Sequence, residues 1–144
     1  MTEFDAEQYF HRQIPITRAM GVRVVAHDES QFVVEAPVGL NSNHLGTAFG
    51  GSINAVATLA AYGLVWLGLR DHPVHVVVAE SSIRFVRPVR ETIRAICRRP
   101  DPEWATFQTR FAEKGKAPIT LSVTVVEAGQ TAAEFEGIFV ARAE

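Results

Sequence analysis

The stretch NSNHLGTAFGGSINAVATLAAYGLVWLGLR, residues 41–70, is the most informative part of the sequence for the fold. It starts as a polar loop punctuated by glycines and continues as a long apolar segment without a charged side chain before Arg70. This pattern predicts a helix from about Gly50 to Leu69, ended by the sequence Asp-His-Pro at 71–73. Because a helix without charge on any side must be covered on all sides, we expect the rest of the chain to wrap around it.

The same segment approaches the length of a membrane span, about 20 residues. Asn54, Thr58 and Tyr62 interrupt its apolar character, and Gly63 and Gly68 weaken it further as a span. We therefore interpret it as a buried helix and expect no membrane partner. The first residues, MTEFDAEQYFHRQ, mix charges and lack the apolar core of a signal peptide.

The composition fits one globular domain, residues 1–144, with 47% apolar and 21% charged residues. The net charge of −2 gives no electrostatic reason to expect nucleic acid as a partner. Cys97 is the only cysteine, which excludes an internal disulfide and a cysteine-based metal site. That usage suits a reducing compartment, so we expect a cytoplasmic protein.

The segments around the central helix are expected to be mostly strands. Residues from Asp5 to about Met20 are predicted to be helical, with Pro15 bending or splitting the helix. A hairpin and then a loop at 37–49 should follow, and Gly115 and Gly129 should make short turns between antiparallel strands. The predicted strands, about seven in number, are 22–27, 31–36, 74–87, 91–99, 104–114, 117–128 and 132–143. The expected class is α+β, an antiparallel sheet wrapped around one long helix.

Two glycines at the start of the central helix suggest a ligand site. The first turn of a helix presents unpaired N–H groups and the positive end of the helix dipole. Because Gly50 and Gly51 have no side chains, a ligand oxygen can reach their amides, as needed to hold an oxyanion or polarise a thioester carbonyl. The alternative is that the pair only serves a turn with positive φ.

Polar residues continue from this point along the helix and precede it in the loop. Gly51, Asn54, Thr58 and Tyr62 follow one another at steps of three, four and four residues, which places them on one face. This stripe either lines a substrate channel or bonds back to carbonyls inside the core. His44, next to Asn43, is placed to act as a general base, to orient water or to cap the loop. The other histidines, His11, His27, His72 and His75, show no metal-ligand spacing with it, so no metal site is expected.

The order of helix, hairpin, NSNHLGTAFGGS loop, apolar helix and strands resembles the hotdog fold. Together with QIPITRAMGVRV and SSIRFVRPV, that loop is similar to the thioesterase domain of the YiiD C-terminal type. The resemblance covers nearly the whole chain. It implies an acyl-CoA or acyl-carrier-protein substrate, no cofactor, and the Gly51 amide at the thioester carbonyl. It also implies a homodimer or dimer of dimers, with the sites at the subunit interface.

The sequence departs from the usual pattern of this fold in its catalytic groups. Many hotdog thioesterases have His-Gly-Gly where this chain has Phe49-Gly50-Gly51, and many carry an acid where Thr58 stands here. Without that acid, the attacking water must be activated by His44 or by a carboxylate on a strand. Alternatively, Asn43 and Thr58 position the water and no strong base takes part. Glu80 is the strand candidate, either as a partly buried base or in an ion pair with Arg84.

Six arginines lie within residues 84–99, and arginine suits the phosphates of CoA or an acidic carrier protein. Most are expected on a solvated outer sheet face, with Arg87 and Arg90 as the phosphate candidates.

Taken with the resemblance, the sequence predicts an acyl-thioester hydrolase. The competing interpretation is a module that binds acyl thioesters without hydrolysing them, and a hotdog dehydratase comes third. The predicted catalytic residues are Asn43, His44, Gly51 and Thr58, and the predicted substrate-binding residues are Phe49, Gly50, Ser52, Asn54, Glu80, Arg87 and Arg90.

Overall fold

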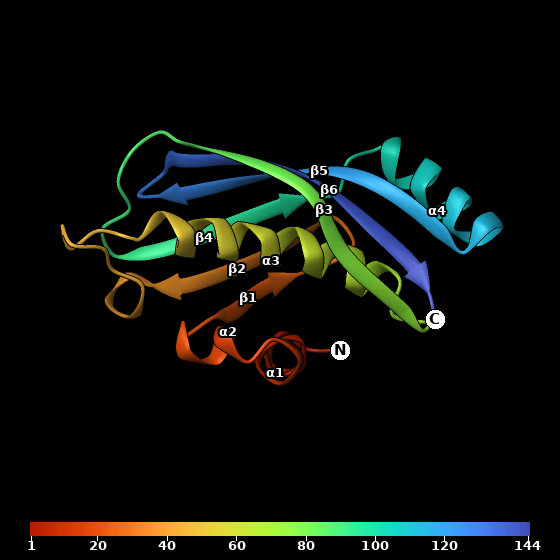
Figure 1. Ribbon diagram of the computed structural model, residues 1–144, viewed down its shortest axis with the longest axis horizontal. Helices are drawn as coiled ribbons and strands as arrows, with labels where there is room; N and C mark the ends of the chain where they lie inside the picture. The colour runs from red at the N-terminus through yellow and green to blue at the C-terminus, as the bar shows by residue number, and fades with distance from the viewer.

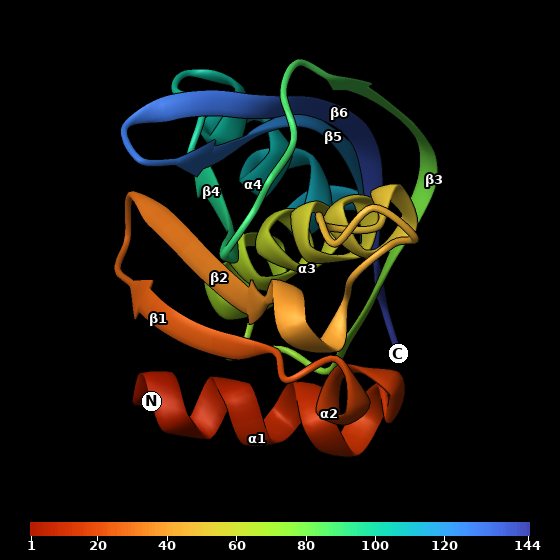
Figure 2. The ribbon, with the colours of Figure 1, turned by 90° about the vertical axis from the view of Figure 1, so that its left-hand side faces the viewer.

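The computed structural model describes all residues, 1–144, and places helix α3 (Gly50–Gly68) in the hollow of a six-stranded antiparallel sheet (Figure 1). The sheet curls around α3, with β1 and β3 as its two edges (Figure 2). The α+β expectation is confirmed. The strand order is β1-β2-β4-β5-β6-β3, for β1 (Arg23–His27), β2 (Gln31–Pro37), β3 (Val74–Phe85), β4 (Thr92–Arg98), β5 (Lys116–Glu127) and β6 (Gln130–Ala143).

The central helix lies inside the fold, but only about half of it is buried, so it is not covered on all sides as its composition predicts. Its length and apolar composition would also suit a membrane span, but here the curved sheet wraps around it (Figure 2). Gly63 brings the helix close to the sheet: a Cβ at this position would lie 2.4 Å from Cε1 of the buried Phe32 ring. The buried residues of α3 are Ile53, Val56, Ala57, Leu59, Ala60, Ala61, Gly63, Leu64 and Val65.

The N-terminal helical region is divided at Pro15 into α1 (Glu3–Gln13) and α2 (Ile16–Ala19), because proline cannot continue the hydrogen-bond ladder of α1. A capping box between Thr2 and Asp5 starts α1. Its Phe10 is fully buried, and the ring of its Tyr9 stacks on Trp66 of α3 at 4.2 Å. Helix α1 therefore covers the side of the molecule next to β1.

The prediction of a strand at 104–114 is wrong, because these residues form helix α4 (Glu103–Lys114). Its buried aromatic residues, Trp104, Phe107 and Phe111, follow at steps of three and four, which is helical spacing. Gly115 is the C-cap of this helix at φ +67°, not a turn between strands. The sheet accordingly has six strands instead of seven. The turn at Gly129, with φ +74°, does join β5 to β6 as expected.

The two edges of the sheet differ in how they are covered. Strand β1 is flanked by α1, whereas β3 pairs only with β6 and offers its other side to the surroundings (Figure 2). Val77 and Val78 of β3 are 59% and 42% exposed, although both are apolar. A long apolar edge strand left unpaired is a template for pairing with another chain.

Candidate active site

The start of α3 presents three backbone amides without acceptors. Phe49 is the N-cap residue and provides no side-chain cap, and no group of the chain accepts a hydrogen bond from the amides of Gly50, Gly51 or Ser52. Gly50 and Gly51 are helical and do not have positive φ, so the alternative of a turn that requires glycine is excluded. The helix start can therefore donate hydrogen bonds to an oxyanion.

Two aromatic rings flank these amides and account for the missing side chains. A Cβ on Gly51 would lie 2.5 Å from Cε2 of Phe49, and one on Gly50 would lie 3.3 Å from Cζ of Phe85. Both rings are more than half exposed, at 56% and 51%. Sequence reasoning selected Phe49 but missed Phe85, which belongs to a strand far along the chain. The amides thus sit between apolar surfaces, which suits a substrate with an apolar group beside its carbonyl.

The loop before α3 is organised by its asparagines. Asn41 is buried and donates from Nδ2 to the carbonyls of Met20 and Pro37, each at 2.8 Å. Asn43 Oδ1 accepts from the amides of Leu45 and Thr47, while its Nδ2 donates to Thr47 Oγ1 at 2.9 Å. A weaker contact of Nδ2, at 3.4 Å to the Ala48 carbonyl, uses the second donor. The amide of Asn43 has no donor left for water, so its geometry supports a role in shaping the loop.

His44 lies at the tip of this tight loop, which the hydrogen bond from Asn43 N to Thr47 O closes at 2.7 Å. Its ring is exposed and makes no hydrogen bond within the chain. The loop is fixed to the rest of the molecule by a hydrogen bond from Ala48 N to Val89 O at 2.8 Å. His44 is therefore an exposed imidazole without a hydrogen-bond partner at the tip of the anchored loop that leads into α3.

The polar stripe along α3 is explained in part by bonds inside the protein. Thr58 Oγ1 donates to the Asn54 carbonyl at 2.8 Å, and the Tyr62 hydroxyl pairs with that of Tyr9 at 2.9 Å. Burial raises the pKa of Tyr62, and its bond to Tyr9 adds to that effect. The amide side chain of Asn54 is half-buried without a partner, so near the helix start the stripe still offers polar groups to a ligand.

Glu80 does not have the environment that the sequence suggested. It is exposed on the edge strand β3, next to a bulge between Val78 and Glu80, and is not the partly buried carboxylate expected there. The predicted ion pair with Arg84 is wrong as well, because Arg84 pairs with Glu134 of β6 at 2.6 Å. The antiparallel register places Glu134 directly opposite Arg84, and a partner on the adjacent strand is closer than one along the same strand.

The segment from β3 to β4 carries the two arginines proposed for phosphate, and they differ. Arg87 is occupied, since it donates from Nε to the Thr131 carbonyl at 3.0 Å and from Nη1 to Gln130 Oε1 at 2.9 Å. The guanidinium of Arg90 is exposed and has no partner, while its backbone is held by Glu127. Because Val89 between them contacts the loop, this segment lies beside the candidate site. Arg94 pairs with Glu35 across the sheet at 2.6 Å, as an outer-face residue should.

The remaining nucleophile, Cys97, is excluded from catalysis by its surroundings. Its side chain is fully buried in the core, and burial raises the pKa of the thiol to about 12. A neutral, inaccessible thiol is not a nucleophile. Most of the predicted site residues lie on the loop and the helix start that follows it: Asn43, His44, Phe49, Gly50, Gly51, Ser52 and Asn54. Arg90 lies on the connection whose Val89 carbonyl accepts from Ala48 of this loop.

A curved antiparallel sheet that holds one long apolar helix, with bare amides at the helix start, defines a hotdog-fold protein. Residues 4–143 match the family described as "Putative thioesterase (yiiD_Cterm)". The chain belongs to this family of hotdog thioesterases. The resemblance drawn from the loop and flanking segments is thereby confirmed.

Three solved structures are similar to this chain over nearly its whole length. A protein of unknown function from Chlorobaculum tepidum TLS is 30% identical, with a TM-score of 0.91 over 99% of this chain and 94% of that one. A structure from Shewanella oneidensis, described as a putative thioesterase, is 29% identical, with a TM-score of 0.87 over 97% and 96%. A Pseudomonas aeruginosa protein described as a probable thioesterase shares the fold at 22% identity and a TM-score of 0.86, over 100% and 97%.

Proposed function

We propose that this protein hydrolyses the thioester of an acyl-CoA or an acyl-carrier protein. The observation that carries the proposal is the set of three unpartnered amides at Gly50, Gly51 and Ser52, at the positive end of α3. A thioester carbonyl placed there gains hydrogen bonds that strengthen as its oxygen becomes negative. Membership of a thioesterase family supports this use of the amides.

In the proposed reaction, water attacks the carbonyl carbon, the C–S bond breaks, and the products are a carboxylic acid and a free thiol. His44 takes the proton from the attacking water and returns it to the leaving sulfur. The amide of Gly51 binds the oxyanion, and Asn43 holds the loop that carries His44. The side-chain amide of Asn54, which has no partner in the chain, orients water or the substrate. Thr58, whose Oγ1 donates to the Asn54 carbonyl, supports this part of the helix and keeps a lone pair free to accept from water.

Substrate recognition is proposed to use the surfaces next to this centre. The exposed rings of Phe49 and Phe85 contact the acyl group beside the carbonyl. The free guanidinium of Arg90 binds a phosphate of CoA or of the carrier protein's pantetheine arm, while Arg87 braces the segment through its bonds to Gln130 and Thr131. We expect the enzyme to act in the cytoplasm, where such thioesters are made and used.

The proposal includes a homodimer built by antiparallel pairing of β3 with β3 of a second copy. Val77, Val78, Phe85 and Val86 on and next to this edge are between 42% and 59% exposed. Pairing would satisfy the free edge of β3 and remove these side chains from water. It would also bring Glu80, at the bulge of β3, close to the second subunit.

The test is thiol release from short, medium, long-chain and aromatic acyl-CoAs and from acyl-carrier proteins. The wild type is compared with His44→Ala and with His72→Ala, an exposed histidine in the turn that follows the opposite end of α3. We expect His44→Ala to lower kcat by about 10²-fold or more, the usual contribution of a general base, and His72→Ala to leave it unchanged. Unchanged turnover in His44→Ala would show that another group activates the water.

Two observations favour a second function: α3 carries no carboxylate, and the side-chain amide of Asn43 is fully engaged inside its loop. A protein with the same amide site but no base would hold acyl thioesters without hydrolysing them. Tight binding of an acyl-CoA with no thiol release from any substrate of the panel would support this binding module in place of the hydrolase.

A further inference from the structure

One side of α3 is left open by the rest of the chain. Gly51 is exposed, and Asn54, Ala55, Thr58 and Tyr62 are partly exposed, whereas the residues between them along the helix are mostly buried. Their spacing of three to four residues places these five on one side, which we call the open face of α3. The open face begins at the amides of the candidate active site and runs away from them along the helix.

The open face is uncharged and, beyond Asn54, has no free hydroxyl donor. The Thr58 hydroxyl donates to the Asn54 carbonyl at 2.8 Å, and the Tyr62 hydroxyl is paired with that of Tyr9 at 2.9 Å. No acidic or basic residue occurs in α3. A charged or strongly polar group of a ligand would lose its bonds to water here without replacing them, whereas an alkyl chain has none to lose.

Helix α1 closes the far end of the open face. The ring of Tyr9 stacks on that of Trp66, with 4.2 Å between the ring centroids, and Phe10 lies 5.9 Å from the Tyr62 ring. In both views α1 lies on the side of α3 away from β5 and β6 (Figure 1 and Figure 2). A chain that follows the open face from Gly51 therefore meets the rings of Tyr62 and Tyr9.

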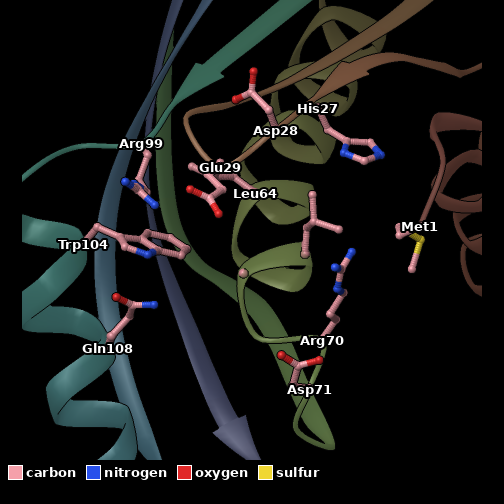
Figure 3. Close-up of a pocket in the computed structure, with 12 residues that line it drawn as sticks. Met1, His27, Asp28, Glu29, Leu64, Arg70, Asp71, Arg99, Trp104 and Gln108 are labelled. Atoms are coloured by element: carbon pink, nitrogen blue, oxygen red, sulfur yellow. The ribbon is translucent and has the colours of Figure 1, made fainter.

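The cavity at the end of α3 does not continue the open face. Leu64, one of its lining residues, follows Tyr62 by two residues and so lies on the opposite side of the helix. Figure 3 shows the charged residues of this cavity, which are Asp28, Glu29, Arg70, Asp71 and Arg99. An uncharged chain is therefore better placed on the open face than in this cavity.

The length of the open face sets the size of the chain that it can hold. Tyr62 follows Gly51 by eleven residues, which is about 16 Å along the helix axis. An extended chain of single bonds advances about 1.2 Å per bond. A chain whose carbonyl lies at the Gly51 amide therefore reaches the tyrosine pair with about twelve carbons.

We propose that the acyl chain of the substrate lies along the open face of α3 and that Tyr9 and Tyr62 determine its maximum length. The proposal rests on the proposed function, because it takes the thioester carbonyl to lie at the Gly51 amide. The Tyr62 ring contacts the end of the chain, and Tyr9 holds that ring in place through the bond between the two hydroxyls and its own stacking on Trp66. The substrate class is thus a medium-chain acyl thioester.

The test is calorimetric titration with ketone analogues of octanoyl-, dodecanoyl- and hexadecanoyl-CoA, below the concentrations at which they form micelles. In these analogues a methylene group separates the carbonyl from sulfur, so binding is measured without hydrolysis. We expect the dodecanoyl analogue to bind wild type about tenfold or more tighter than the octanoyl analogue, because each methylene removed from water adds affinity. The hexadecanoyl analogue should bind no tighter than the dodecanoyl one.

Variants test the role assigned to the two tyrosines. Tyr62→Ala should bind the hexadecanoyl analogue about tenfold tighter than the dodecanoyl one, and Tyr9→Ala should change the order in the same direction. Phe4→Ala is the control, because Phe4 is an aromatic residue of the same helix that is 65% exposed. A loss of stability alone would weaken binding of all three analogues and keep their order.

The outcomes separate this proposal from the proposed function. Tighter binding of the hexadecanoyl than of the dodecanoyl analogue to wild type would overturn the length limit, even where no variant folds. The wild-type order of affinities in both tyrosine variants would overturn their assignment. No binding of any analogue would overturn the proposed function as well. The expected order without thiol release from dodecanoyl-CoA would support the length limit and contradict only the hydrolase.

Discussion

Glu127 shows how much of the candidate site depends on a single distant carboxylate. Its Oε1 accepts from the amide of Arg90 at 2.9 Å, and its Oε2 accepts from the amides of Glu91 and Thr92 at 2.8 and 3.1 Å. Partial burial alone would raise the pKa of Glu127, but these three bonds and the charge of Arg90 outweigh it and hold the pKa below its ordinary value. The carboxylate thereby fixes the segment that also supports the loop through Val89.

The lowered pKa of Glu127 predicts a pH-dependent contribution to stability. A group whose pKa is lower in the folded state stabilises the fold above about pH 5, and this contribution is lost as the pH falls through the folded-state pKa. Glu127→Gln should lower the free energy of unfolding at neutral pH by about 1 kcal/mol, since partial exposure screens the charge. The difference from wild type should shrink below about pH 4.

Urea unfolding of Glu127→Gln and wild type across this pH range makes the measurement. Glu113→Gln is the control, because Glu113 is an exposed residue of α4 with no hydrogen bond from its side chain. A difference that stays constant with pH, or that grows in acid, would show that the Glu127 carboxylate is not the source of the effect.

At the scale of single residues, the sequence identified groups near the site better than it identified their roles. The bare amides at Gly50 and Gly51 follow from composition alone, since a glycine pair before an apolar helix leaves the first turn open. Asn43 was expected to hold water, but both ends of its amide are used inside the loop. Glu127 was missed, because its three partners lie more than thirty residues away along the chain.

At the scale of elements, Gly63 tests the contact between α3 and the sheet. Alanine is the better helix former by about 1 kcal/mol, so propensity alone favours Gly63→Ala. Its Cβ would, however, lie 2.4 Å from the ring of Phe32, which is fully buried and has no room to move. Overpacking of this kind costs about 1–3 kcal/mol, and we expect it to outweigh the gain in propensity.

Thermal or denaturant unfolding should therefore show Gly63→Ala to be less stable than wild type by about 1–2 kcal/mol. Gly39→Ala is the matched control, because a Cβ at Gly39 has no atom within 4 Å. If Gly63→Ala proved as stable as wild type, α3 would have to shift away from β2 at little cost, contrary to the close packing of Gly63 on Phe32.

Helix α4 shows why sequence reasoning failed for one element. Residues 104–114 are rich in aromatic residues, and this enrichment favoured a strand. The positions of Trp104, Phe107 and Phe111 carried the contrary signal, since their spacing places all three on one helical face against the core. Asp101 and Pro102 before the helix and Gly115 after it are also typical helix boundaries. Periodicity was the better guide here than composition.

At the scale of the whole molecule, the sequence predicted the enclosure of α3 because an uncharged helix has only that outcome in a globular domain. It could not show which strand would be left at the edge. Chain order places β3 directly after α3, yet in the sheet β3 lies outside β6, the last strand of the chain. Its exposed valines are therefore a property of the topology and not of the local sequence.

The exposed edge of β3 predicts the assembly. We expect the wild type to have twice the monomer mass of 15.8 kDa in solution, measured by light scattering after size-exclusion chromatography. Val77→Lys and Val78→Lys place a charge where a second β3 would pair, so both should run as monomers and lose thioesterase turnover with the dimer. Thr124→Lys is the control, since Thr124 lies on β5 between two paired strands, opposite Ile96 of β4 and Glu134 of β6. If the variants are folded monomers without turnover, part of the site lies on the second subunit. If the wild type is itself a monomer and fully active, one subunit contains the complete site and the predicted dimer is wrong.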